Sequence, residues 1–190
     1  LYTDDKGYLV TTPIPYGTYV VTESVTPHNY KTIKPFEVVV SENHPTEPQV
    51  WRVFMDREFD AKLRIIKKDA ATGKTVLLPN ASFKIFNLDT NEYVSQVTTY
   101  PSVVVHDVFT TDEDGDLILP SALSVGNYRI EEVAAPFGYV VSDKTVTIAV
   151  DTDTFYEVDE VAKAAIINVP FDDEPVRGEL SVIKTGDVLV

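Results

Sequence analysis

The sequence predicts an all-β protein built from repeated β-sandwich units. Short runs rich in Val, Ile, Thr and Tyr alternate with turn residues along the whole chain. No window longer than about two turns keeps a convincing 3.6-residue apolar period. Several blocks of sequence also recur in the same order, which indicates an internal duplication.

The expected strands are short, and turn signals separate them. In chain order they are YLVTT, GTYVVTE, FEVVV, KLRIIK, SFKIFN, NYRIEE, KTVTIAV and ELSVIK. Their β-branched and aromatic residues favour a pleated, half-buried strand, whereas the Gly, Pro, Asn and Asp between them favour turns. The stretch at residues 93–109 is long for a hairpin connection, so we expect ligand specificity, if the protein has any, to lie there.

The internal repeat is visible in matched pairs of segments. In the pair TPHNY and APFGY, Asn29 stands where Gly138 stands, which suits a turn that needs positive φ. Another such pair aligns the asparagine of AIINVPF with Asp56. The remaining pairs are TDDKGYLV with TDEDGDLI, YGTYVVTE with VGNYRIEE, and KLRIIKKD with ELSVIKTGD.

These matches predict how the chain is divided. Residues 1–60 are expected to be the C-terminal part of a first β-sandwich repeat, and residues 61–175 a complete repeat. Residues 176–190 are expected to hold the opening strand of a third. The charged stretches DREFDA and FDDEPVRG are natural linkers between them.

Composition excludes several functions. The formal net charge of -14 argues against a nucleic-acid partner, which would call for clustered Lys and Arg. Because the chain has no cysteine, disulfides, thiolate metal sites and a Cys nucleophile are excluded. No stretch has the length of a membrane span, and the first residues lack a signal-peptide pattern, so we expect any export signal to lie outside this chain.

Three polar residues are predicted to face the interior. In KLRIIK, Lys67 shares a face with Leu63 and Ile65, because successive side chains of a strand alternate between faces. By the same alternation Glu132 lies on the apolar face of NYRIEE. Asn168 stands between apolar neighbours in AIINVPF. Buried ionisable groups are costly unless they are neutral, paired or used.

The three residue types together predict a cross-linking reaction. Desolvation favours a neutral amine at Lys67 and a protonated acid at Glu132. A neutral amine is a nucleophile, so it can attack the Asn168 carboxamide while Glu132 donates a hydrogen bond to the oxygen and relays protons. The product is an amide between side chains, with loss of ammonia, formed once per molecule. An ordinary buried polar network is the alternative interpretation.

The neighbouring repeats carry related residues. In the first, Glu23 is the expected acid and Asp56 the expected partner, which would lose water in place of ammonia. In the third, Lys184 faces inward with Leu180 and Val182. We also consider that the Lys184 strand of one molecule completes the first unit of another, in the manner of strand complementation.

The motifs resemble a known family. The blocks IKKDAATGKTVLLPNASFKIFN, TDEDGDLILP, GNYRIEEVAAPFGY and INVPF look like SpaA-type, collagen-adhesin B-type (prealbumin-like) domains of Gram-positive pilins and surface adhesins. The resemblance implies a prealbumin-like (Ig-like) β-sandwich with an autocatalytic isopeptide bond between its first and last strands. It assigns Lys67, Glu132 and Asn168 to that bond, and the family includes Lys–Asp versions.

The resulting hypothesis is a structural stalk or fibre repeat at the cell wall of a Gram-positive bacterium, a self-cross-linking protein without enzymatic turnover. Its partners are neighbouring repeats of the same chain. The alternative is an adhesin module that binds a host surface protein or glycan through its loops or residues 93–109; an extracellular hydrolase is least supported. No cofactor or metal is expected, because TDEDGD lacks the loop length and distal glutamate of a calcium loop and the histidines lack ligand spacing.

Overall fold

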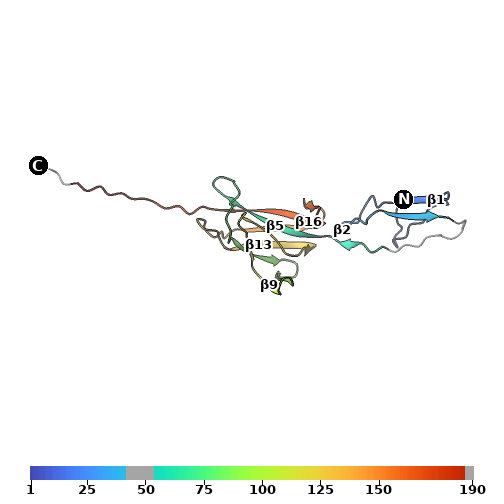
Figure 1. Cartoon of the computed structure of the whole chain (residues 1–190), viewed down its shortest axis with the longest axis horizontal. Helices are drawn as coiled ribbons and strands as arrows, with labels where there is room; N and C mark the ends of the chain where they lie inside the picture. The colour runs from blue at the N-terminus through green and yellow to red at the C-terminus, as the bar shows by residue number, and fades with distance from the viewer. Residues whose placement is uncertain (42–53, 187–190) are drawn as a thin grey trace. The chain divides into compact units, whose positions relative to one another are not determined.

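The structure is a computed structural model that describes residues 1–41 and 54–186 (Figure 1). These residues form strands and turns and contain no helix, so the predicted all-β class is confirmed. The chain divides into two compact units, Leu1–Phe59 and Asp60–Val190, called unit 1 and unit 2 below.

The described residues of unit 1 form two small antiparallel sheets. The strand β1 (Gly17–Val21) pairs with β3 (Phe36–Val40), and β2 (Tyr30–Lys31) pairs with β4 (Arg57–Glu58). The Phe36 and Phe54 rings lie 4.4 Å apart between centroids. The strands of unit 1 are therefore held by ladder hydrogen bonds and by an aromatic contact.

Unit 2, as far as residue 186, contains two five-stranded sheets. In the first, β6 (Ser82–Asn87) lies between β10 (Phe109–Thr110) and β13 (Gly126–Ala134); β14 (Thr145–Val150) pairs with β13, and β7 (Glu92–Tyr93) with β6. In the second, β5 (Asp60–Asp69) lies between β11 (Asp116–Ile118) and β16 (Ala164–Asp173); β15 (Glu157–Asp159) pairs with β16, and β12 (Leu123–Ser124) with β5. All pairs are antiparallel except β5 with β16, which run parallel.

The core of unit 2 lies between these two sheets. In β5 every second side chain from Ala61 to Lys67 is buried, because alternate residues of a strand point to the same face. The Phe83 ring of one sheet meets the Phe171 ring of the other edge to face, with centroids 5.1 Å apart. The fully buried apolar side chains include Leu63, Ile65, Ile85, Leu119, Ile130, Val150, Ile167 and Val169.

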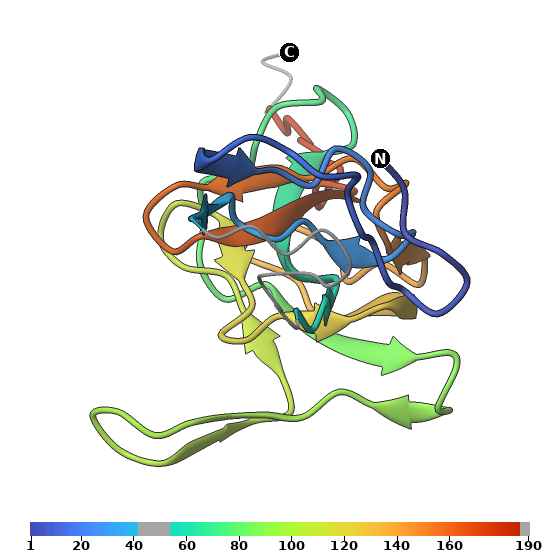
Figure 2. The same cartoon turned by 90° about the vertical axis from the view of Figure 1, so that its right-hand side faces the viewer.

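A further hairpin belongs to the long segment at residues 93–109. The strands β8 (Gln96–Thr98) and β9 (Val104–His106) pair only with each other among the described residues. The hairpin stands off from the two larger sheets (Figure 2). Its tip is exposed, with Tyr100 at 91% of its full accessible surface.

Two of the expected strands do not form. YLVTT and ELSVIK have the right residue pattern, but no strand is assigned to either of them. A β-strand needs a hydrogen-bonding neighbour as well as a suitable pattern, and neither segment has one among the described residues. Lys184 is accordingly exposed, although the pattern placed it on an inward face. Residues 187–190 of the expected third portion lie outside the described residues.

The candidate cross-link site

The site is built on Lys67, near the end of the first strand of unit 2. Its side chain is fully buried, because residue 67 falls on the same face of β5 as Leu63 and Ile65. The ammonium group lies between two aromatic rings, 5.4 Å from the centroid of Phe83 and 4.6 Å from that of Phe171. Rings at this distance attract a cation and exclude water from it.

Two carboxyl groups contact the Lys67 amine. Lys67 Nζ lies 2.8 Å from Glu132 Oε1 and donates a hydrogen bond to it. It also forms an ion pair with Asp173 Oδ1. All three side chains have no exposed surface. The site therefore holds one amine and two carboxyl groups, out of contact with water, from three different strands.

Glu132 is held by a hydrogen bond to its second oxygen. The backbone N–H of Ser142 donates to Glu132 Oε2 at 2.8 Å. Glu132 lies in β13 on the same face as Ile130, and β13 shifts register against β6 between residues 132 and 134. One carboxylate oxygen is thus fixed by the backbone while the other meets the lysine.

Asp173 is the last residue of β16. In the parallel β5–β16 pair it stands opposite Asp69, and Phe171 stands opposite Lys67. Burial raises the pKa of Asp173 to about 6; the Lys67 ammonium opposes this rise, and the Glu132 carboxyl adds to it. Asp173 is therefore more readily protonated in the folded protein than an ordinary aspartate.

The structure does not bring Asn168 to this site. Asn168 stands opposite Arg64 in the β5–β16 pair, and it lies on the opposite face of β16 from Val169, Phe171 and Asp173. Its Oδ1 atom is buried and has no hydrogen-bond partner. The structure thus places Asp173, and not Asn168 as predicted, beside the Lys67 amine, because the two residues lie five positions apart in β16 and side chains alternate between faces.

A sequence signal could have identified Asp173. Asp173 lies eleven residues before Lys184, and Asp56 lies eleven residues before Lys67. The strand pairing gives the same alignment. Glu58, two residues after Asp56, pairs with Tyr30, and Pro175, two residues after Asp173, bridges Tyr139. Asp56 thus corresponds to Asp173, whereas the pattern match had aligned it with Asn168.

Unit 1 repeats the local arrangement around the acid. The backbone N–H of Ile33 donates to Glu23 Oε2 at 2.9 Å, ten residues after the glutamate. This matches the hydrogen bond from Ser142 to Glu132, which also spans ten residues. Glu23 therefore corresponds to Glu132. Asp56 is exposed, and its unit contains no described lysine equivalent to Lys67.

The turns that follow the two glutamates also correspond. The N–H of Tyr30 donates to the carbonyl of Pro27 at 3.1 Å, and that of Tyr139 donates to the carbonyl of Pro136 at 3.1 Å. Asn29 has a φ of 64° where Gly138 has a φ of 86°. The exchange of glycine for asparagine therefore keeps the left-handed turn.

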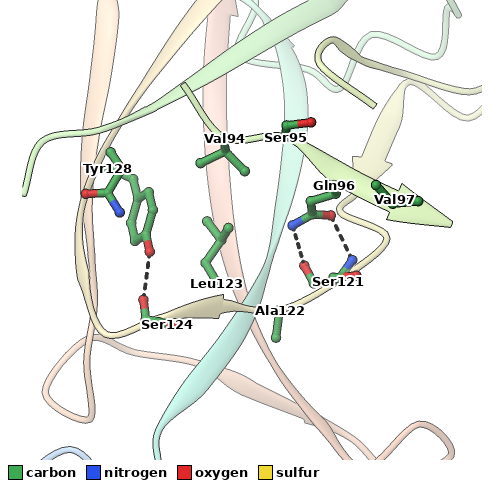
Figure 3. Close-up of a pocket in the computed structure, with 10 residues that line it drawn as sticks. Val94, Ser95, Gln96, Val97, Ser121, Ala122, Leu123, Ser124 and Tyr128 are labelled. Atoms are coloured by element: carbon green, nitrogen blue, oxygen red, sulfur yellow. Dashed lines mark hydrogen bonds between the residues drawn. The ribbon is translucent and has the colours of Figure 1, made fainter. Parts of the chain in front are cut away.

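A second feature is a cleft beside the β8–β9 hairpin (Figure 3). Its volume is about 380 Å³. Two hydrogen bonds join the lining residues Gln96 and Ser121. Gln96 Nε2 donates to the Ser121 carbonyl at 3.0 Å, and Gln96 Oε1 accepts from the Ser121 N–H at 2.8 Å. The lining residues are Asn87, Val94, Ser95, Gln96, Val97, Ser121, Ala122, Leu123, Ser124 and Tyr128.

Neither a metal site nor a membrane span emerges from the part of the chain that the structure describes. No group of three or more His, Asp or Glu side chains is arranged to hold a metal ion there. That part likewise contains no helix of the length and apolarity needed to cross a membrane.

Comparison with known proteins identifies the family. A model of the SpaA family, described as a prealbumin-like fold domain, matches residues 1–52 and 61–163. The chain belongs to this family, which confirms the resemblance inferred from its motifs. No curated protein sequence matches the chain.

Solved structures include similar chains. The Bacillus anthracis TIE protein is 28% identical with a TM-score of 0.52; the match covers 92% of this chain and 28% of that one. The pilus 2b backbone protein of group B streptococcus is 17% identical (TM-score 0.44; 81% and 52% covered). The major pilin SpaD of Corynebacterium diphtheriae is 18% identical (TM-score 0.46; 63% and 31% covered). The chain thus spans about a quarter of the length of the TIE protein.

Proposed function

We propose that the chain is a load-bearing segment of a bacterial surface protein, a pilin or an adhesin stalk, whose unit 2 is locked by an amide bond between Lys67 and Asp173. The observation that carries the proposal is the buried contact of the Lys67 amine with the Glu132 and Asp173 carboxyl groups. A merely structural ion pair does not need a second acid at the same amine. Two carboxyl groups on one lysine provide an acceptor and a proton relay.

The proposed reaction is a condensation. The neutral Lys67 amine attacks the carboxyl carbon of Asp173, and Glu132 gives a proton to the oxygen that leaves. The C–N bond forms, the C–OH bond breaks, and one water molecule is released. Glu132 recovers its proton from the nitrogen, so the acid is unchanged and no cofactor takes part. The reaction occurs once per molecule, and the protein is not a turnover enzyme.

Burial favours this reaction in two ways. The three groups are held in contact, which replaces the entropy cost of an encounter between separate molecules. The site also excludes water, which disfavours the charged pair and stabilises the neutral amine and acid. The raised pKa of Asp173, about 6, is consistent with an acceptor that is easily protonated.

The bond would protect unit 2 against pulling. β5 and β16 are the first and last strands of the unit and lie side by side in parallel. Tension that enters β5 and leaves after β16 would pass through the amide and spare the ladder hydrogen bonds between the two strands. The segment between Lys67 and Asp173 would carry no load, so the unit would stay folded while the chain is stretched.

The bond would also stabilise the fold without tension. It closes a loop of about one hundred residues, and a cross-link of that length removes about 4.7 kcal/mol of unfolded-state entropy in the chain-entropy model. This is comparable with the net stability of a typical small domain. Unlike a disulfide, an amide needs no oxidising surroundings, which suits a chain without cysteine.

The tandem arrangement is part of the proposal. Glu23 and Asp56 of unit 1 correspond to Glu132 and Asp173 of unit 2, so we assign them as the acid and the acceptor of an equivalent bond. Lys184 would be the lysine of a following repeat. The equal spacing of eleven residues from Asp56 to Lys67 and from Asp173 to Lys184 supports a regular array of such units.

The surface location and the partners follow from the same proposal. Membership of the SpaA family supports a cell-surface protein of a Gram-positive bacterium, with neighbouring repeats of its own chain as the main partners. The high negative charge suits an extended protein that has to avoid self-association.

High-resolution intact mass measurement of the purified chain tests the proposal. A bond to Asp173 predicts a mass below that of the sequence by one water, whereas a bond to an asparagine would remove one ammonia. A peptide containing both Lys67 and Asp173 should appear after proteolysis. An unmodified mass would refute the cross-link.

Ligand binding by the β8–β9 hairpin is the second candidate function. Residues 94–106 contain no Asp, Glu, Lys or Arg, in a chain of which 24% is charged. Val97, Tyr100 and Val105 of this segment are more than half exposed. Deletion of residues 99–103 should abolish adhesion to host cells if the hairpin binds a host ligand, and should leave it unchanged if unit 2 is only a stalk.

A further inference from the structure

Lys67 and Asp173 lie near the C-terminal ends of the paired strands β5 and β16. Asp173 is the final residue of β16, and Lys67 lies two residues before the end of β5. Strand and helix ends fray more easily than their middles, whereas condensation needs the reacting atoms held close together. The ladder reaches this end, where the N–H of Ala70 donates to the carbonyl of Asp173 at 2.9 Å, and a contact beyond the ladder would hold the two ends further.

Gly138–Val140, called the clamp segment here, supplies that contact on β16. The N–H of Val140 donates to the carbonyl of Glu174 at 3.0 Å, and the N–H of Val176 donates to the carbonyl of Gly138 at 2.8 Å. Tyr139 and Pro175 form the antiparallel bridge between these two hydrogen bonds. Backbone hydrogen bonds to the clamp segment therefore hold the residues directly after Asp173.

The side chain of the central clamp residue reaches the other strand. The Tyr139 hydroxyl donates a hydrogen bond to Asp69 Oδ2 at 2.9 Å, and Asp69 stands opposite Asp173 in the β5–β16 pair. Asp69 Oδ1 accepts from the N–H of Thr72 at 2.8 Å. The Tyr139 hydroxyl is the largest cause that lowers the pKa of Asp69, so this neighbouring carboxylate stays ionised and engaged elsewhere than at the Lys67 amine.

The clamp segment is also continuous with the acid. It lies between Glu132 and Ser142, whose N–H fixes Glu132 Oε2. A tyrosine at the matching place in unit 1, Tyr30, begins β2 and pairs with Glu58. The same segment thus adjoins all three reacting residues: Lys67 through Asp69, Asp173 through Pro175, and Glu132 through its own chain.

We propose that Tyr139 is a positioning residue for the cross-linking reaction: it ties the ends of β5 and β16 together and so holds the Lys67 amine against the Asp173 carboxyl. The inference rests on the cross-link proposed above. Tyr139 touches none of the reacting atoms by a described hydrogen bond; it acts through Asp69 and the backbone at Pro175.

The test follows bond formation in the full chain made by cell-free translation, sampled over time for intact mass. Tyr139→Phe keeps the ring and removes the hydroxyl, and it should slow the loss of one water by at least about tenfold, because hydrogen bonds to charged groups are the stronger ones. Tyr93→Phe is the matched control. It removes a hydroxyl that donates to Glu131 at 2.9 Å on the outer face, and it should leave the rate unchanged.

Two further measurements separate positioning from general stability. Rates are compared at a temperature at which all variants are folded, judged from melting curves in an Asp173→Ala background that cannot form the bond. Asp69→Ala should slow the reaction as Tyr139→Phe does, and the double variant should be no slower than the slower single variant, since both remove the same contact.

Each outcome decides between the alternatives. A Tyr139→Phe chain that closes its bond as fast as the unsubstituted chain overturns the inference. The inference is also overturned if the double variant is slowed by the product of the two single effects, because the two residues would then act independently. If the unsubstituted chain never loses water, the cross-link itself fails, and this inference fails with it.

Discussion

Lys67 Nζ and Glu132 Oε1 lie 2.8 Å apart with both side chains fully buried, at the point where β5 and β13 face each other across the core of unit 2. An acid beside a buried amine lowers the cost of burying the charge, but it is also placed to relay a proton. Substitution of Asp173 can separate these two roles, because it removes the second carboxyl group at the amine and leaves Lys67 and Glu132 themselves unchanged.

The choice of acceptor is the first prediction. Asp173→Ala should restore the full unmodified mass, because the amine then has no carboxyl carbon to attack. Asn168→Ala should still lose one water, since Asn168 lies on the other face of β16. High-resolution intact mass measurement reads both variants. The reverse pattern would reinstate Asn168 as the partner.

The acid is the subject of the second prediction. Glu132→Gln keeps the size of the side chain and removes its proton relay, so the bond should form very slowly or not at all. Without the bond the free energy of unfolding should fall by about 4 to 5 kcal/mol, the loop-closure contribution. Denaturant unfolding measures this, with Glu131→Gln on the outer face as the control. An uncross-linked chain of unchanged stability would contradict the entropic account.

Bond formation should depend on pH. The pKa of Asp173 is raised to about 6 by burial, so its protonated form prevails below that pH and is lost above it. The reaction needs this protonated carboxyl beside a neutral Lys67 amine, a state with as many protons as the ion pair. The rate should therefore level off above about pH 6, where the ion pair prevails, and fall towards tenfold per unit as the pH drops below 6 and the carboxyl is protonated beside an ammonium. Intact mass measured against time after translation, at pH values from 5 to 8, gives the profile. A rate that falls as the pH rises from 6 to 8 would contradict the assignment.

Two matched glycines provide a prediction about the fold. Gly115 has a φ of +75°, and a Cβ there would lie 1.7 Å from the Val76 carbonyl oxygen, a contact with rigid backbone. Gly115→Ala should therefore lower the free energy of unfolding by more than about 3 kcal/mol. Gly7 has a φ of +79° with nothing within 4 Å of its Cβ position, so Gly7→Ala should cost only about 1 to 2 kcal/mol. Equal effects in denaturant titrations would show that the close approach does not matter.

Unit 1 can be tested with an added strand. A synthetic peptide of residues 179–186 carries Leu180, Val182 and Lys184 on one face, as β5 carries Leu63, Ile65 and Lys67. If Glu23 and Asp56 form an acid and acceptor pair, the chain should gain the mass of the peptide less one water. Asp56→Ala, or a peptide with Lys184→Met, should prevent this. An adduct that persists with Asp56→Ala would place the acceptor elsewhere.

Local patterns in the sequence were sufficient for part of the site. The alternation of side chains along a strand is fixed by the backbone, so the inward direction of Lys67 and Glu132 could be read from their apolar neighbours. The repeat likewise indicated the turn at Asn29 and Gly138, because only a few residues tolerate positive φ. Belonging to the SpaA family followed from the motifs and did not require coordinates.

Only the tertiary structure decided which residue meets the lysine. Asn168 and Asp173 lie in the same strand, but the structure places Asp173 beside the Lys67 amine and Asn168 opposite Arg64. The stagger of two parallel strands far apart in sequence depends on packing between the sheets, so no pattern within either strand gives it; only the eleven-residue spacing shared by the Asp56–Lys67 and Asp173–Lys184 pairs points to Asp173. The sequence by itself therefore determined the all-β class and the inward direction of Lys67 and Glu132; the packing of the core decided that Asp173 meets the Lys67 amine, because proximity across strands is a property of the assembled structure.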